Sequence, residues 1–541
     1  MCMRPGAGIV FSKVNYSMTN NWLLLCIVLV CSQAKAQQNI PIGSWRTHYS
    51  FRDSHSVSSN PDGLFTAGSN SLFYLDNEDL SLTKVGKIDG LSDTNIASIG
   101  YHDNSNTLVI AYANGNIDLL ADNKVFNLPT LLSAPTGASK RTNDITFEDN
   151  LAYLATDFGV VVVDLVKSEI QEAYTNIGIQ GGMTAILAGD VFRDSLFLAT
   201  PEGLISGALS PGNNLQDYSN WYRFGLLDGL PTEGVSNVGS SINQLFASVD
   251  FDGIYLKQGK DWVRLDFDLS YPVLHMTSAT EVVVITTSRS VITIDNNLTV
   301  SESTNEIYPR PQSTELTGET LMIADSVNGL IFSGPDMATS VFPNGPFSDS
   351  ISSVHFLNDV LFALPGGYDN TGKPLRSNLG FYVFQEGSWV NYNSTGLLET
   401  EPFPNVKDLV DVTYNTDNDN YYFASFGEGI IEWTPGNEAR ILDETTQGSS
   451  LQNALPPGRN VLVSCVLADQ QGNIWAGNYG NPSPLHKYDP EDKSWSSYQT
   501  VFPAGRYPLH FELLDHGDFW LQLDPVSYTH LTLPTNTVTW G

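Results

Sequence analysis

Apolar residues along the chain fall into short runs, and polar turns separate these runs. Residues 96–120 show the pattern most clearly, with an apolar run, a turn of Asp and Asn residues, a second run, a turn that contains Gly115, and a third run. The same order recurs in residues 144–165 and 188–207. Runs of this length, bounded by Asn, Asp, Gly and Ser, predict antiparallel strands rather than helices.

The turn glycines recur at a nearly constant interval. Gly115, Gly159 and Gly203 follow one another at steps of 44 residues (159 − 115 and 203 − 159). A repeat of roughly 40–50 residues with three or four strands is typical of a β-propeller blade, whereas a β-solenoid repeats at roughly 20–30 residues. We therefore predict an all-β fold, with a seven-bladed β-propeller over residues 37–346 and a second, incomplete β-propeller of about three to four blades over residues 347–525.

The first 36 residues have the pattern of a secretory signal peptide. Arg4 and Lys13 precede an apolar core at residues 22–31, and Ala34-Lys35-Ala36 has the small-residue pattern of a cleavage site. A membrane anchor is the alternative, but this apolar core is too short to cross about 30 Å of hydrocarbon. We therefore predict that residues 1–36 are removed and that the protein is exported.

The last residues break the repeat. Residues 526–541 follow the point where a turn and a third strand are due, and they resemble a translated adapter sequence. We predict that they are not native, and a frayed terminal strand is the alternative, since the segment has some β propensity.

Charge and cysteine content exclude several classes of function. The chain has 26 basic and 59 acidic residues, a net charge of −33, so its surface should repel the phosphates of nucleic acids. Three of the four cysteines lie in the predicted signal peptide, which leaves Cys465 alone. One cysteine forms neither an internal disulfide nor a metal cage of cysteines, and its apolar surroundings predict a buried thiol.

The sequence contains no recognisable catalytic constellation. It has no His-Glu-x-x-His pair, no Gly-x-Ser-x-Gly turn and no phosphate-binding glycine loop, so we assign no catalytic, cofactor-binding or metal-binding residue. Residues 415–420 (NTDNDN) resemble half of a calcium loop but lack its later glycine and glutamate, which favours a polar hairpin turn. Trp221 and Tyr222 could bind a sugar, although packing on an edge strand is the simpler interpretation.

One short motif occurs twice near the end of the chain. Residues 469–478 (DQQGNIWAGN) and 515–524 (DHGDFWLQLD) both combine an acidic residue, a glycine turn and a tryptophan. The motif could be a binding site. We interpret it as a marker of the repeat, with Gly472 in a hairpin turn and Trp475 packed between sheets.

This motif also carries a family resemblance. Asp469, Gly472 and Trp475, together with the segments 88–99 and 225–238, resemble the repeats of regulator-type propellers in Bacteroidetes two-component proteins. A more specific resemblance lies at the start of the predicted mature chain, where residues 38–51 are similar to PorZ-like proteins of the type IX secretion system. That resemblance implies two seven-bladed propellers, a C-terminal β-sandwich, and partners in a surface complex of PorU sortase, PorV and PorQ that joins cargo to anionic lipopolysaccharide.

These observations favour a non-enzymatic accessory protein of type IX secretion at the outer-membrane surface, with the periplasm as the alternative location. No cofactor is expected, and the resemblance supplies no catalytic motif to place on this chain. Two rivals remain. One is the extracellular sensor of a hybrid two-component regulator, which would continue into a transmembrane helix and a kinase. The other is a propeller polysaccharide lyase or sialidase, which would need an axial pocket with converging Arg, His and Tyr side chains.

Overall fold

The computed structural model describes residues 45–499, 508–514 and 519–523, apart from residues 136, 232–233, 335–336 and 455–459. Strands make up most of these residues, and the all-β prediction is confirmed. The predicted signal peptide and the predicted non-native tail both lie outside the described residues. Within the described part of the chain, no helix is long and apolar enough to cross a membrane.

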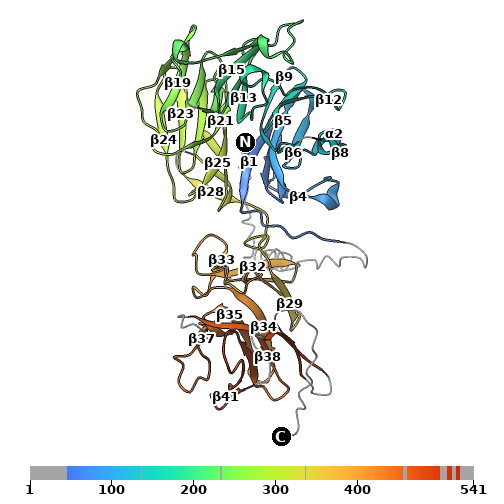
Figure 1. The fold of residues 1–541 in the computed structure, drawn as a ribbon, viewed down its shortest axis with the longest axis vertical. Helices are drawn as coiled ribbons and strands as arrows, with labels where there is room; N and C mark the ends of the chain where they lie inside the picture. Colours follow the sequence, from blue (N-terminus) through green and yellow to red (C-terminus); the bar gives the residue numbers. More distant parts are fainter. Residues whose placement is uncertain are drawn as a thin grey trace, which may run out of the picture. The chain divides into compact units, whose positions relative to one another are not determined.

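Seven four-stranded antiparallel sheets follow one another from Ser54 to Val341 (Figure 1). The strands of the first four sheets are β1 (Ser54–Asn60), β2 (Gly63–Gly68), β3 (Leu72–Asp76), β4 (Leu82–Val85), β5 (Ile96–His102), β6 (Thr107–Tyr112), β7 (Ile117–Ala121), β8 (Lys124–Leu128), β9 (Thr142–Glu148), β10 (Leu151–Thr156), β11 (Gly159–Asp164), β12 (Glu169–Tyr174), β13 (Ala188–Phe192), β14 (Ser195–Thr200), β15 (Gly203–Ala208) and β16 (Trp221–Arg223). Those of the next three are β17 (Val235–Ser240), β18 (Leu245–Val249), β19 (Gly253–Gln258), β20 (Asp261–Arg264), β21 (Val273–Ser278), β22 (Val282–Thr287), β23 (Val291–Asp295), β24 (Val300–Ser303), β25 (Pro311–Thr317), β26 (Thr320–Asp325), β27 (Gly329–Ser333) and β28 (Ala338–Val341).

Within the described residues, helical structure is confined to short turns between strands. These are α2 (Thr130–Ser133) and the 3-10 turns η1 (Lys87–Asp89), η2 (Asp103–Ser105), η3 (Ile179–Gly181), η4 (Tyr218–Asn220) and η5 (Leu226–Asp228). In η1 and η5 a carboxylate accepts a hydrogen bond from the glycine N–H three residues earlier, in Gly86–Asp89 and Gly225–Asp228, both at 2.9 Å. The two segments with similar sequences, 88–99 and 225–238, therefore begin with the same local structure.

Each sheet is built from one contiguous segment, and neighbouring strands are joined by tight hairpins. Gly159 shows why the repeat needs glycine at the second hairpin. Its φ is +137°, and a Cβ atom there would lie 2.1 Å from the carbonyl oxygen of Tyr174. Only glycine fits a position with both this backbone conformation and this close approach.

Neighbouring sheets pack face to face through their middle strands. Every residue of β11 is buried, and its side chains alternate between two cores. Val161 and Val163 pack with Val109 of β6 in the preceding sheet, whereas Val160 and Val162 pack with residues of β14 in the next sheet. A strand buried on both faces is apolar at nearly every position, which explains the continuous valine run in the sequence.

The seventh sheet packs on the first and closes the ring. Phe73 and Leu64 of the first sheet share a buried core with Leu330 of β27. The N–H of Gly329 donates to the carbonyl of Arg52 at 2.9 Å. Each of the seven sheets takes its four strands from one continuous segment of the chain, so the first and seventh sheets share no strand among the described residues. Side-chain packing and hydrogen bonds such as this one close the propeller instead.

A second, smaller set of sheets follows in the chain. Its strands are β29 (Ser353–Leu357), β30 (Val360–Leu364), β31 (Phe381–Gln385), β32 (Ser388–Asn393), β33 (Thr400–Pro402), β34 (Leu409–Asn415), β35 (Asn420–Gly427), β36 (Gly429–Trp433), β37 (Arg440–Leu442), β38 (Val461–Ala468), β39 (Ile474–Asn478), β40 (Leu485–Asp489), β41 (Ser494–Tyr498), β42 (Pro508–Leu513) and β43 (Phe519–Leu523).

The second set forms a five-stranded sheet, β29 to β33, and then two four-stranded units, β34 to β37 and β38 to β41. Strand β35 also pairs with β38 at Phe426 and Leu462, and β42 pairs with β43. The predicted fold class, a seven-bladed propeller followed by an incomplete one, is confirmed. The domain boundaries at residues 37, 346 and 525 stay predictions.

Candidate functional site

The innermost strands of the first propeller share a local irregularity. Six of these seven strands, all except β13, carry a β-bulge or register shift near their start. A bulge redirects the side chains that follow it. The residues directly after the six shifts are all polar: Ser56, Ser98, Asp144, Asn237, His275 and Ser313.

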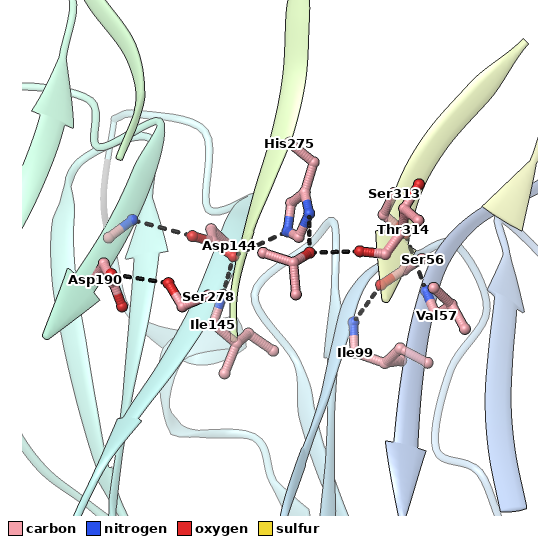
Figure 2. Close-up of polar contacts among 12 residues, drawn as sticks. Ser56, Val57, Ile99, Asp144, Ile145, Asp190, His275, Ser278, Ser313 and Thr314 are labelled. Atoms are coloured by element: carbon pink, nitrogen blue, oxygen red, sulfur yellow. Dashed lines mark hydrogen bonds and ion pairs between the residues drawn. The ribbon is translucent and has the colours of Figure 1, made fainter. Parts of the chain in front are cut away.

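Several of these polar side chains bond to the inner strand of a neighbouring sheet. The N–H of Ile99 donates to the Ser56 hydroxyl at 3.3 Å, and the N–H of Gly189 donates to Asp144 at 3.0 Å. Figure 2 shows these bonds linking successive strands around the axis. An inner strand has one edge without a strand partner, so its buried N–H groups need such acceptors.

Asp144 and His275 make a contact of a different kind. They lie on β9 and β21, which belong to the third and sixth sheets, and the Asp144 carboxylate lies 3.7 Å from Nε2 of His275 (Figure 2). The other ring nitrogen of His275 lies 3.2 Å from the hydroxyl of Thr277. Thr277 in turn donates to the carbonyl of Thr314 at 2.6 Å. This chain of polar contacts joins sheets that are not neighbours in sequence.

Two further carboxylates on inner strands are deeply placed. Burial raises the pKa of Asp190 to about 6, although its Oδ2 atom accepts a hydrogen bond from the Ser278 hydroxyl at 2.9 Å. Burial also raises the pKa of Glu315, which accepts from the N–H of Ser59 at 2.8 Å. On both of these inner-strand carboxylates, burial thus favours the protonated form.

The second set of sheets repeats this arrangement. Asp411 on β34 accepts a hydrogen bond from the N–H of Val466 on β38 at 3.0 Å, as Asp144 does from Gly189. A histidine, His355, lies 3.5 Å from the same carboxylate. Burial raises the pKa of Asp411 to about 6. Because an aspartate on one inner strand bonds to the next inner strand in both sets, we interpret its main role as joining neighbouring sheets.

The chemistry available along the axes is limited. Among the residues that the structure describes, no group of three or more His, Cys, Asp or Glu side chains could hold a metal ion. Cys465 is fully buried, and burial raises the pKa of its thiol well above its usual value, which keeps it protonated and a poor nucleophile.

The motif at residues 469–478 forms a turn. The Asp469 carboxylate accepts hydrogen bonds from the N–H groups of Gln471 and Asn473 and from the indole of Trp475, each at 2.9 Å. Gly472 adopts a φ of +74° in this turn between β38 and β39, and the Trp475 ring stacks on Tyr498 with centroids 5.4 Å apart. The carboxylate is thus occupied by its own hairpin; Asp515, which opens the second copy, lies outside the described residues.

Residues 415–420 also form a hairpin turn, between β34 and β35. The side-chain oxygens of Asn415 and Asn418 accept hydrogen bonds from the N–H groups of Asp417 and Asn420, at 2.9 and 3.2 Å. These oxygens stabilise the turn, so the segment forms the polar hairpin that its sequence favours.

Trp221 and Tyr222 lie on the edge strand β16. Trp221 is 6% exposed and donates its indole N–H to the carbonyl of Leu215 at 2.8 Å. Tyr222 is exposed, and its hydroxyl donates to Asp228 at 2.6 Å. The tryptophan therefore packs on the edge of the sheet and offers no free ring face for a sugar.

Sequence reasoning missed a cavity of about 380 Å³ where β13, β17 and β21 end. Its lining includes Arg193, Ser240 and Ser278, which lie far apart in the sequence. The packing of three successive sheets brings these hairpins together, so no local sequence signal could have identified the cavity.

The repeated four-stranded sheets, bonded to one another around a polar axis, define a β-propeller protein. Residues 64–222 match the family model described as the PorZ N-terminal beta-propeller domain of type IX secretion. The predicted resemblance to PorZ-like proteins is confirmed.

Comparison with solved structures agrees on the fold. PorZ of Porphyromonas gingivalis, described as an essential bacterial surface component of the type IX secretion system, superimposes with a TM-score of 0.75 at 21% identity. The match covers 88% of this chain and 63% of PorZ, so the chain spans less than two thirds of that protein. The extracellular domain of a putative hybrid two-component system from B. thetaiotaomicron matches with a TM-score of 0.39 and 10% identity, over 87% of this chain and 74% of that one. No curated protein sequence matches.

Proposed function

We propose that this protein is a non-enzymatic accessory component of type IX secretion, exported and displayed at the outer-membrane surface. The observation that carries the proposal is the PorZ domain match over residues 64–222, together with the PorZ-like fold over most of the chain. In this role the protein helps a sortase complex attach cargo to anionic lipopolysaccharide. The periplasm is the alternative location.

A binding role suits the polar groups of the propeller axes. Asp144 and Asp411 accept hydrogen bonds from neighbouring strands, and Asp469 is occupied by its own turn. Carboxylates committed to the scaffold are poorly placed to act as general acids or bases, because moving them would break bonds between the sheets. A propeller of this kind acts through the loops that it presents.

The proposed protein partners are the PorU sortase and proteins similar to PorV and PorQ. A tagged copy expressed in its native cell should copurify with the sortase after mild solubilisation of the outer membrane. The control is the same purification with an unrelated tagged outer-membrane protein. Recovery of sortase at the level of that control would contradict this partnership.

The proposed glycan partner is anionic, whereas the protein is itself strongly acidic, with a net charge of −33. Two surfaces of like charge repel one another, so binding requires a local cationic group. The purified protein, immobilised, should retain lipopolysaccharide that carries anionic polysaccharide and should not retain lipopolysaccharide that lacks it. Equal retention of both would contradict recognition of the anionic glycan.

A further inference from the structure

The hairpins of three neighbouring sheets line an open, shallow cavity at the ends of β13, β17 and β21. Its volume of about 380 Å³ lies in the range of roughly 300–1,000 Å³ that is usual for small-molecule sites. The lining residues used below are Phe192, Arg193, Ser240, Ile242, Ser278 and Thr280.

One side of the cavity is a hydroxyl network that rests on a buried carboxylate. The Ser278 hydroxyl donates to Asp190 at 2.9 Å and accepts from the N–H of Ser240 at 2.8 Å. Asp190 is only 7% exposed, so it anchors the two serines from beneath (Figure 2 shows its bond to Ser278). Hydroxyls fixed in this way are suited to hydrogen bonding with a ligand that itself carries many hydroxyls.

The hairpin after β17 is held in place from two sides. The N–H of Ile242 donates to the carbonyl of Thr280 at 3.1 Å, which joins it to the next hairpin. The hydroxyl of Ser241 donates to the side chain of Asn296 at 3.0 Å. Because these bonds already order the hairpin, a ligand would bind with little further loss of conformational entropy.

Arg193 supplies the cation. Its guanidinium lies over the ring of Phe192, 5.0 Å from the ring centroid, and the side chain is exposed. Across the described part of the chain, Arg193 makes no ion pair. Beside it, Phe192 and the 63% exposed Ile242 present apolar surface to the cavity.

The acidic groups nearby limit what this cation could bind. Asp149 and Asp194 lie close enough to Glu148 to contribute to its raised pKa, after the larger effect of burial. Asp194 directly follows Arg193 in the chain. A densely charged polyanion would be repelled there, whereas an oligosaccharide with one anionic group on each sugar residue is repelled less and can bring one such group to the guanidinium.

We propose that this cavity binds a sugar residue that carries one carboxylate or phosphate. Arg193 pairs with the anionic group, Ser240 and Ser278 bond to ring hydroxyls, and Phe192 and Ile242 contact the apolar face of the ring. The proposal deepens the proposed function, because it gives the glycan of that role a site. Its link to lipopolysaccharide rests on the proposed function, whereas the binding of an acidic sugar does not.

The test measures binding of three probes to the purified protein by calorimetry or ligand-observed NMR. The probes are trigalacturonic acid, the neutral galactotriose, and lipopolysaccharide with or without its anionic polysaccharide. The variant is Arg193→Ala. The matched control is Arg289→Ala, which removes an exposed arginine from the hairpin between β22 and β23, at the opposite end of its sheet. Unchanged thermal unfolding midpoints establish that both variants fold.

We expect trigalacturonic acid to bind the protein and its affinity to fall about tenfold or more in Arg193→Ala, since a hydrogen bond to a charged group contributes on that scale. Arg289→Ala should bind it like the parent protein. Equal affinity of the two variants, equal binding of galactotriose, or no binding of trigalacturonic acid would overturn the proposal.

The lipopolysaccharide probe separates this proposal from the proposed function. If anionic lipopolysaccharide binds and Arg193→Ala retains full affinity for it, the glycan role stands and the cavity is not its site. If trigalacturonic acid binds through Arg193 but lipopolysaccharide does not bind, the cavity is an acidic-sugar site and the lipopolysaccharide role is contradicted.

Discussion

The carboxylate of Asp144 accepts a hydrogen bond from the N–H of Gly189 at 3.0 Å, and this bond ties the third sheet of the propeller to the fourth. Asp411 and Val466 form the same bond in the second set of sheets, also at 3.0 Å. The axial aspartates are therefore parts of the scaffold that recur with the repeat.

Removing the Asp144 carboxylate should destabilise the propeller. In Asp144→Ala the Gly189 N–H loses its acceptor, and an unsatisfied buried N–H costs about 1–3 kcal/mol. Asp144→Asn keeps one acceptor oxygen and should lose less. Urea unfolding followed by circular dichroism gives the free energies, and equal stability of Asp144→Ala and the parent protein would show that the bond does not hold the sheets together.

Closure of the first propeller depends on packing between its first and seventh sheets. Phe73 is 1% exposed in the core that these two sheets share, so Phe73→Ala should lower the free energy of unfolding by about 3–5 kcal/mol. Phe251 is fully exposed, and Phe251→Ala should change it by no more than about 0.5 kcal/mol. Similar unfolding midpoints for the two variants would mean that the ring is not closed in this way.

The stability of the first propeller should depend on pH through Asp190. Burial raises its pKa from an ordinary 3.8 to about 6, so the folded protein binds this proton more tightly than the unfolded chain does. The protonated Asp190 therefore contributes its full stabilisation below about pH 4, and this contribution is lost as the pH rises to about 6. The corresponding decrease in the free energy of unfolding is roughly 2–3 kcal/mol.

Asp190→Asn should abolish this part of the pH dependence. Urea unfolding of both proteins between pH 4 and pH 7 measures it, and the difference between them is the informative quantity because other groups titrate in the same range. A pH profile shared by the parent protein and Asp190→Asn would be evidence that Asp190 titrates normally.

Asp469 should contribute to stability through its hairpin and not to binding. Asp469→Ala removes the acceptor for two N–H groups and for the Trp475 indole, which should cost about 1–3 kcal/mol and alter tryptophan fluorescence. Asp492→Ala, at an exposed position in the turn between β40 and β41, is the matched control. Loss of lipopolysaccharide binding in Asp469→Ala without a change in stability would restore the interpretation of the motif as a site.

The repeat and the fold class could be predicted because they depend on local patterns. The valine run of β11 and the glycine at position 159 follow directly from a strand buried on both faces and a turn at positive φ. The hairpin roles of Gly472 and Asn415 were predictable for the same reason, since each depends on its own few residues.

The cavity could not be predicted, because it depends on contacts between distant segments. Arg193, Ser240 and Ser278 come from three separate hairpins, and their meeting depends on how the sheets are ordered around the axis. The contact between Asp144 and His275 is hidden in the same way, since 131 residues (275 − 144) separate the two side chains. The bulge that six of the inner strands share could not be predicted either, because the pattern of apolar and polar residues does not indicate it.

The proposed role in type IX secretion is tested most directly by following cargo in cells that lack this protein. The measurement is the fraction of cargo with a type IX signal that remains attached to the outer membrane, compared with the fraction released into the medium. We expect attached cargo to fall sharply in the deletion strain and to recover when the intact gene is restored. Normal attachment of cargo in the deletion strain would contradict the proposed function.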